Sequence, residues 1–225
     1  MVLDLFGTLV AAPSTVERRF AAHRFAEVLS VSPATAESVL SATWRERHDG
    51  RLKSTSDLAA EFVARCDAPA SSTGELVRLL ATLADDRLRA DPTVMEALTT
   101  LRRSGLRLAV LSDAAPDIAE AWHRCDLASY CDVAVFSCRA GAVKPAPQLF
   151  NAVVTALRVA PEQVLYCGDG GGDELAGAER AGLHAVRVER RGAPDALVFG
   201  ETVWHGGVIP RLETLPSLLH SWSQG

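Results

Sequence analysis

Residues 1–10, Met-Val-Leu-Asp-Leu-Phe-Gly-Thr-Leu-Val, decide the fold of this chain. A short apolar run ends in a single carboxylate, Asp4, and is followed by Gly7 and Thr8. Apolar residues before one acid predict a buried strand that carries the acid at its carboxyl end. In an open parallel sheet, ligands bind beyond the carboxyl ends of the strands. The stretch therefore predicts that Asp4 is a nucleophile or a metal ligand rather than a surface charge.

The composition indicates a globular protein with a packed core. The 225 residues are 48% hydrophobic and 23% charged, and this length allows one large domain or a core domain with a smaller insertion. The net charge is −5 and no basic block occurs, so we expect no nucleic-acid partner. No apolar run reaches the length of a membrane span, and the first residues lack a signal-peptide pattern, so we expect no membrane association.

The five cysteines are odd in number and include no Cys-x-x-Cys pair. This pattern argues against a disulfide framework and against a structural zinc site. Cysteines that stay reduced are typical of the cytoplasm, which is where we expect this protein to be.

The order of expected elements predicts an α/β fold with a helical insertion. Helical periodicity dominates residues 15–89, and no convincing strand occurs there. From Pro92 onward, helical patterns alternate with apolar strands, which we expect at residues 106–111, 133–136, 164–167, 185–188 and 208–209. This alternation predicts a doubly wound, Rossmann-like parallel sheet. We expect a core domain of residues 1–14 and 90–225 and an inserted helical domain of residues 15–89.

Ser112 and Asp113 follow the strand expected at residues 106–111. At a strand tip, a serine hydroxyl and nearby backbone N–H groups can hold an anionic oxygen. When this stretch is taken alone, a serine that caps the following helix is the better explanation.

Lys144 is a second candidate, in the loop Gly141–Pro147. Prolines on both sides of Ala146 stiffen the backbone of this loop, so the ammonium is not on a flexible tether. Lys53 is the only other lysine in a chain whose cations are mostly arginines, which singles out Lys144. The alternative is a solvated loop charge.

Asp169 and Asp173 share a glycine-rich loop, Gly-Asp-Gly-Gly-Gly-Asp, after the strand expected at residues 164–167. Two carboxylates on one tight loop repel each other unless a cation holds them together. Oxygen ligands alone suggest Mg²⁺. An acidic helix start would explain Asp173, but it would not explain Asp169 or the glycines.

These four stretches, in this order, resemble the haloacid dehalogenase superfamily, most members of which are phosphatases. The resemblance runs from Leu3 to Gly182, and the inserted helices resemble the cap of that family. It implies that Asp4 is the catalytic nucleophile, assisted by Ser112 and Lys144. It implies that the phosphate is bound by Thr8, Ser112, Asp113 and Lys144, and that Mg²⁺ is held by Asp4, the backbone carbonyl of Phe6, Asp169 and Asp173.

The implied reaction is the Mg²⁺-dependent hydrolysis of a small phosphorylated metabolite through an aspartyl-phosphate on Asp4. Bound cations would offset the repulsion between the carboxylate and the phosphate dianion. The resemblance implies nothing about oligomeric state.

Phe6 departs from the family pattern, because phosphatases of the family carry at this position a second aspartate that transfers protons. Proton transfer is worth roughly 10²–10⁴-fold in rate. Three hypotheses follow. The first is a phosphatase in which His23, His48 or Glu46 replaces the missing acid, or whose substrate has a leaving group good enough without it. The second is a 2-haloacid dehalogenase that needs neither the acid nor a metal. The third hypothesis is a weakly active or inactive member that binds a ligand.

Overall fold

The computed structural model describes residues 1–189, 192–196, 200 and 203–222. A six-stranded parallel sheet has the strand order β3-β2-β1-β4-β5-β6, so the predicted doubly wound parallel sheet is confirmed. The strands are β1 (Val2–Leu3), β2 (Ala109–Ser112), β3 (Val133–Phe136), β4 (Leu165–Gly168), β5 (His184–Val188) and β6 (Gly207–Ile209).

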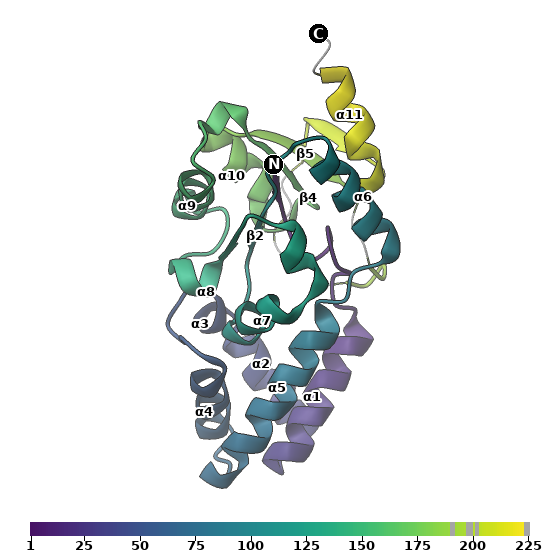
Figure 1. The fold of residues 1–225 in the computed structure, drawn as a ribbon. Coiled ribbons are helices and arrows are strands. Elements are labelled where there is room, and N and C mark those ends of the chain that lie inside the picture. The colour runs from purple at the N-terminus through teal and green to yellow at the C-terminus, as the bar shows by residue number, and fades with distance from the viewer. Residues whose placement is uncertain (190–191, 197–199, 201–202, 223–225) are drawn as a thin grey trace.

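The helices of the described residues alternate with these strands after a helical stretch near the N-terminus (Figure 1). They are α1 (Thr15–Leu29), α2 (Pro33–Ala42), α3 (Trp44–His48), α4 (Thr55–Arg65), α5 (Thr73–Arg87), α6 (Pro92–Arg103), α7 (Pro116–Ala121), α8 (Ser137–Ala140), α9 (Pro147–Leu157), α10 (Glu174–Arg180) and α11 (Leu215–Trp222). None of the helices in these described ranges has both the length and the apolar character needed to cross a membrane.

Helices cover both faces of the sheet, with α6 and α11 on one side and α9 and α10 on the other (Figure 1). Successive residues of a strand point to opposite faces, so β1, β2 and β4 contribute to both cores. Leu3, Val110 and Cys167 belong to the apolar cluster under α6 and α11. Val2 and Tyr166 belong to the cluster under α9 and α10. Strands that are buried on both faces need apolar side chains at nearly every position, which agrees with the apolar runs in the sequence.

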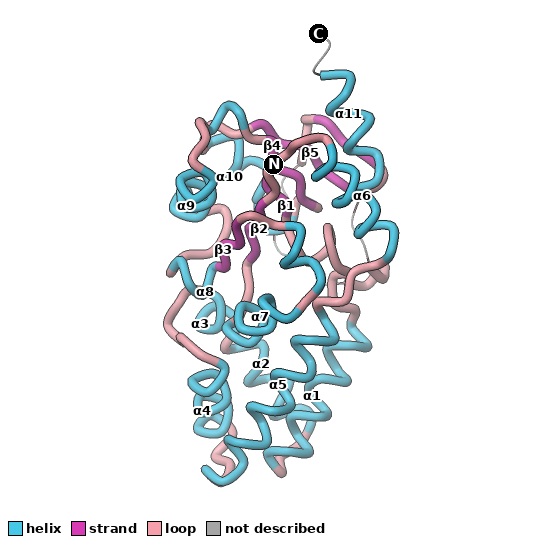
Figure 2. Tube along the Cα trace, viewed as in Figure 1, coloured by secondary structure: helices cyan, strands magenta, loops and turns pink. Residues whose placement is uncertain are grey.

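Helices α1 to α5, called the helical segment below, pack around an apolar cluster of their own that includes Phe25, Leu58, Phe62 and Leu76. Figures 1 and 2 show them grouped beyond one end of the sheet. The carboxyl ends of the strands face this segment, since residues that follow β1, β2 and β4 line one cavity together with residues of α1 and α4. This separate cluster supports our proposal that residues 15–89 form an inserted domain.

Helix α1 begins where the sequence provides a capping box. The Ser14 hydroxyl accepts a hydrogen bond from the backbone N–H of Glu17, and the Glu17 carboxylate accepts one from the backbone N–H of Ser14. Such reciprocal bonds satisfy two N–H groups that a helix start otherwise leaves unpaired. The turn between the first strand and the helical segment is thereby fixed locally.

Gly177 in α10 lies against the loop that carries Lys144, and this contact gives a test of the packing. A Cβ at Gly177 would lie 2.8 Å from the Pro145 Cβ and 2.9 Å from the Phe150 ring. We expect Gly177→Ala to lower the free energy of unfolding by about 1–2 kcal/mol, because overpacking outweighs the gain in helix propensity. The measurement is urea denaturation.

Gly74→Ala is the matched control, because its Cβ would meet only the end of the Arg78 side chain at 4.0 Å. This variant should be neutral or stabilised by up to about 1 kcal/mol. Equal urea midpoints for the two variants would contradict the packing described here.

Candidate active site

Asp4 is held at the carboxyl end of β1 by hydrogen bonds to its backbone and to its side chain. Its backbone N–H donates to the carbonyl of Cys167 in β4 at 2.9 Å. The chain then turns through Gly7, whose φ of 90° lies in the left-handed region that favours glycine. The turn brings the Thr8 hydroxyl back to donate to Asp4 Oδ2 at 3.2 Å. The carboxylate is buried and its orientation is fixed.

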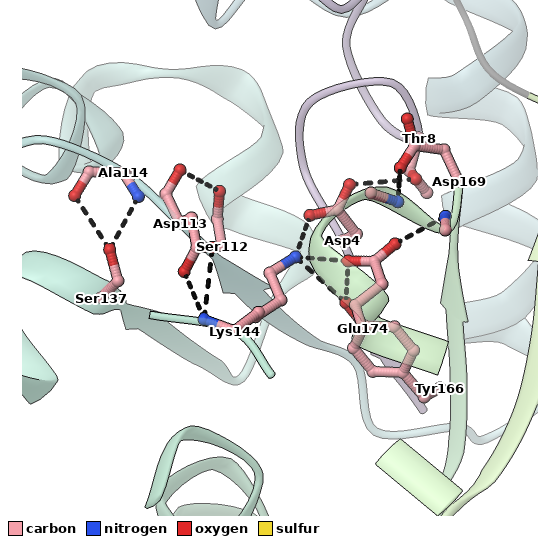
Figure 3. Close-up of polar contacts among 12 residues, drawn as sticks. Asp4, Thr8, Ser112, Asp113, Ala114, Ser137, Lys144, Tyr166, Asp169 and Glu174 are labelled. Atoms are coloured by element: carbon pink, nitrogen blue, oxygen red, sulfur yellow. Dashed lines mark hydrogen bonds and ion pairs between the residues drawn. The ribbon is translucent and has the colours of Figure 1, made fainter. Parts of the chain in front are cut away.

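Lys144 lies at the centre of the site (Figure 3). Its Nζ is 2.5 Å from Asp4 Oδ1 and 2.5 Å from Glu174 Oε2, and it donates to the Tyr166 hydroxyl at 3.1 Å. The side chain is only 4% exposed. The backbone N–H of Lys144 donates to Asp113 Oδ1 at 3.0 Å, which ties the lysine loop to the end of β2. The solvated loop charge considered above is therefore excluded.

Glu174, at the start of α10, holds Lys144 from the other side. Its Oε2 accepts hydrogen bonds from Lys144 and from the Tyr166 hydroxyl, the latter at 2.6 Å, and its Oε1 accepts one from the Gly170 N–H at 3.0 Å. A Cβ at Gly168 would overlap this carboxylate, so only glycine fits there. Sequence reasoning missed both Glu174 and Tyr166 as site residues.

The structure brings together three acids, namely Asp4, Asp169 and Glu174, with one carboxylate oxygen from each lying within 4.8 Å of the others. Asp173 is not part of this group. It adopts a left-handed conformation in the loop, and its backbone N–H donates to the carbonyl of Gly200. Of the expected acidic pair, Asp169 lies in this group, whereas Asp173 does not and its neighbour Glu174 does.

The charges of this group favour an additional cation. Three buried carboxylates face a single ammonium. Burial and the neighbouring Glu174 raise the pKa of Asp4 above its usual range, and Lys144 offsets only part of this effect. Burial alone would lower the pKa of Lys144, but Asp4 and Glu174 raise it well above the ordinary lysine value, so Lys144 stays an ammonium.

The donor set fits a hard divalent cation such as Mg²⁺, which prefers oxygen ligands. Glu174 Oε2 already accepts two hydrogen bonds, whereas each oxygen of Asp4 accepts one. Asp169, whose Oδ1 accepts a bond from the Gly171 N–H at 2.9 Å, lies beside Asp4. Asp4 and Asp169 are therefore the carboxylates that could hold the ion.

The end of β2 supplies the other side of the site. Ser112 is buried, and its backbone is part of the last rung of the strand. Asp113 follows it, and burial raises the pKa of the Asp113 carboxyl to about 6. Such a carboxyl can give and accept protons near neutral pH.

One cavity of about 760 Å³ joins these groups to the helical segment. Six of the eight residues expected from the sequence line it, namely Asp4, Phe6, Ser112, Asp113, Lys144 and Asp169. Thr8 lies behind Asp4, fully buried, and orients it. Glu174 lines the cavity although the sequence suggested only an acid at a helix start.

Comparison with known proteins identifies the class of protein that this fold and site define. The model of the haloacid dehalogenase-like hydrolase family matches residues 1–182. The chain belongs to this family of hydrolases, which confirms the resemblance seen in the sequence. It is 32% identical over 170 residues to a phosphoserine phosphatase of Thermus thermophilus, a match that covers 72% of this chain and 68% of that protein.

Solved structures with the same fold carry two different activities. A 2-haloacid dehalogenase from Pseudomonas syringae pv. Tomato superposes with a TM-score of 0.71 at 20% identity, covering 98% of this chain and 97% of that one. A phosphatase of the family from Thermococcus onnurineus gives a TM-score of 0.66 at 20% identity, covering 97% and 96%. At these identities, the likeness establishes the fold alone.

Tyr166→Phe tests the network around Lys144. The variant removes a hydroxyl that donates to a buried carboxylate, and hydrogen bonds to charged groups are worth about 1.5–3 kcal/mol. We expect the free energy of unfolding to fall by about 1–3 kcal/mol in urea denaturation.

Tyr130→Phe is the control, since the Tyr130 hydroxyl only meets that of Thr99, at 3.4 Å, and is partly exposed. Its expected effect stays within about 0.5 kcal/mol. A Tyr166→Phe protein as stable as this control would show that the tyrosine does not support Glu174.

Proposed function

We propose that this protein is a Mg²⁺-dependent hydrolase of a small phosphomonoester, acting through an aspartyl-phosphate on Asp4. The observation that carries the proposal is the buried meeting of Asp4, Asp169 and Lys144 at one end of the cavity. Its relative in Thermus thermophilus, a phosphoserine phosphatase, supports the same reaction class.

In the first step, a carboxylate oxygen of Asp4 attacks phosphorus, the bond from phosphorus to the ester oxygen breaks, and an acyl phosphate forms on Asp4. The hydrogen bonds from Thr8 and Lys144 keep the Asp4 carboxylate in one orientation, so little conformational entropy is lost on reaching the transition state. Lys144 and the Ser112 hydroxyl would bind phosphate oxygens. A bound Mg²⁺ on Asp4 and Asp169 supplies charge neutralisation of the phosphoryl group.

The leaving oxygen needs a proton that Phe6 cannot give. His23 and Glu46 do not line the cavity, and Glu46 is paired with Arg65 at 2.5 Å. His48 does line it, but burial lowers its pKa to about 3, so at neutral pH it is a neutral imidazole rather than the imidazolium that a general acid requires.

We assign proton transfer to Asp113 instead. Its carboxyl lines the cavity, and its pKa of about 6 allows both protonation states near neutrality. In the first step it would protonate the leaving oxygen. In the second step the resulting carboxylate would take a proton from the water that attacks phosphorus, releasing phosphate and restoring Asp4.

A 2-haloacid dehalogenase is the second candidate, and Phe6 favours it. In that reaction Asp4 would attack carbon, and a halide would leave without a proton. An aromatic ring at position 6 is then no handicap. The three-carboxylate group weighs against it, because a metal-free reaction gains nothing from Asp169 beside Asp4.

A panel of phosphomonoesters and 2-haloacids, assayed with Mg²⁺ and with EDTA, separates these functions. We expect phosphate release that requires Mg²⁺ and is abolished in Asp4→Asn. In Asp169→Asn the Mg²⁺ concentration for half-maximal rate should rise about tenfold or more.

Asp173→Asn is the matched control, because this neighbouring acid lies outside the group around Asp4. Its Mg²⁺ dependence should stay close to that of the unaltered protein. Halide release that persists in EDTA would replace the phosphatase by the dehalogenase. Failure on both panels would leave a ligand-binding protein.

The pH profile tests Asp113. The acid form of Asp113 is populated below about pH 6, so the turnover of alkyl phosphates should fall as the pH rises through 6. Asp113→Asn should remove this limb and lower the alkyl phosphate rate by about 10²–10⁴-fold. Aryl phosphates with good leaving groups need less protonation, so both effects should be small for them. An equal loss on both ester types would mean that Asp113 is not the acid.

A further inference from the structure

All three hydrogen-bond donors of the Lys144 ammonium are occupied by protein groups (Figure 3). An ammonium has three N–H donors and no acceptor. They go to Asp4 Oδ1 and Glu174 Oε2, each at 2.5 Å, and to the Tyr166 hydroxyl at 3.1 Å. Lys144 can therefore bind a phosphate oxygen only after it gives up one of these partners.

Tyr166 is the partner whose loss costs least. Asp4 and Glu174 are carboxylates, and their attraction to the ammonium is stronger than that of a neutral oxygen. Burial and the neighbouring Glu174 raise the pKa of the Tyr166 phenol well above its ordinary value, so the hydroxyl keeps its proton and stays neutral. That proton is donated to Glu174 Oε2 at 2.6 Å. The tyrosine thus keeps a hydrogen bond when the ammonium leaves it.

Tyr166 lies behind Lys144 as seen from the cavity. Asp4, Lys144 and Glu174 line the cavity, whereas Tyr166 is fully buried and is not among the described residues that line it. Its ring packs edge-on against Phe150, with 5.7 Å between the ring centroids, which fixes the hydroxyl in place. The ammonium ends a stem of four carbons with several rotatable bonds. In any exchange of partners, the lysine is the side chain that moves.

We propose that Tyr166 is a positioning residue, which holds the third donor of Lys144 until a phosphate oxygen replaces the phenol. The proposal rests on the proposed function only in taking a phosphoryl group as the ligand. Asp4 and Glu174 stay bound to the ammonium throughout. The exchange breaks one hydrogen bond to a neutral oxygen and forms one to an anionic oxygen, and no proton is transferred.

This exchange makes the tyrosine a competitor of phosphate, because its bond to Lys144 stabilises the ligand-free protein but not the complex. Tyr166→Phe keeps the ring and removes the bond, while Glu174 keeps Lys144 and the Gly170 N–H as partners. Calorimetry in the presence of Mg²⁺ should show inorganic phosphate binding to this variant about three- to tenfold more tightly. A tyrosine that only supports the structure predicts weaker or unchanged binding.

Kinetics give the same readout during turnover. In Tyr166→Phe, the KM of a phosphomonoester and the inhibition constant of phosphate should fall together, with kcat unchanged within about twofold, because substrate and transition state gain equally. Val94→Ala is the control for lost stability. It removes part of a fully buried side chain in the cluster under α6 and leaves the partners of Lys144 in place, so its phosphate affinity should not change.

The Lys144 ammonium can also be observed directly by NMR, because the chain has only two lysines and Lys53 is exposed. The lysine nitrogens are labelled with a heavy isotope, and Lys53 serves as the internal reference. The Lys144 signal should differ between Tyr166→Phe and the unaltered protein without phosphate. The two signals should approach each other when both proteins are saturated with phosphate, since neither then has the bond to the phenol.

Phosphate binding to Tyr166→Phe that is no tighter than to the unaltered protein would overturn the proposal. A difference in the Lys144 signal that persists undiminished at saturation would do so as well. Ester turnover without the change in affinity would leave the proposed function in place and remove the role of Tyr166. Tighter phosphate binding without turnover of any ester would do the reverse. If neither protein binds phosphate, both proposals fail.

Discussion

The site depends on one buried interaction, the contact of the Lys144 ammonium with Asp4 and Glu174 at 2.5 Å each. Removing a charge from water is expensive, and only close, well-oriented partners make it tolerable. The lysine is therefore surrounded by partners from several segments, since β1 supplies Asp4, β4 supplies Tyr166 and α10 supplies Glu174. Separating these segments would leave a buried charge without its partner. The same contact fixes the carboxylate that we assign as the nucleophile.

The sheet explains why residues so far apart in the chain can meet. β1 lies between β2 and β4, and all three run in the same direction. The chain first adds β2 and β3 on one side of β1 and then adds β4 on the other side. The loops that follow these strands therefore diverge beyond the carboxyl end of β1 and leave a crevice there. Asp4 and Asp169 follow strands at that edge, and Ser112 is the last residue of one. Each of these side chains lies at the end of a run of apolar residues that is buried in the core.

The sequence was informative wherever one strand or loop determines the outcome. The apolar runs identified the strands, and Asp4, Lys144 and Asp169 stood out because each is isolated in its local context. Glu174 did not stand out in the sequence. Three glycines precede Asp173 and Glu174, so the spacing alone does not show which of these two side chains points into the site. Positive φ values at Gly170, Gly172 and Asp173 turn the loop so that Glu174 points inward. The approach of Arg47, Arg87 and Asp117 was equally invisible, since they come from α3, α5 and α7 and only tertiary packing brings them to one cavity.

The cavity has a surplus of negative charge around Asp4, and this surplus constrains its chemistry. Around Asp4 the carboxylates outnumber the ammonium, which favours a divalent cation and, through it, a phosphoryl group. A neutral or purely apolar ligand would leave this surplus unsatisfied. Phe6 fits the same account. With an aromatic ring beside the nucleophile, proton transfer has to come from another wall of the cavity, and Asp113 on the β2 side is the acid whose pKa lies in the useful range. In the function that we propose, the sheet edge holds the reacting end of the substrate, and the helical segment faces the rest of it.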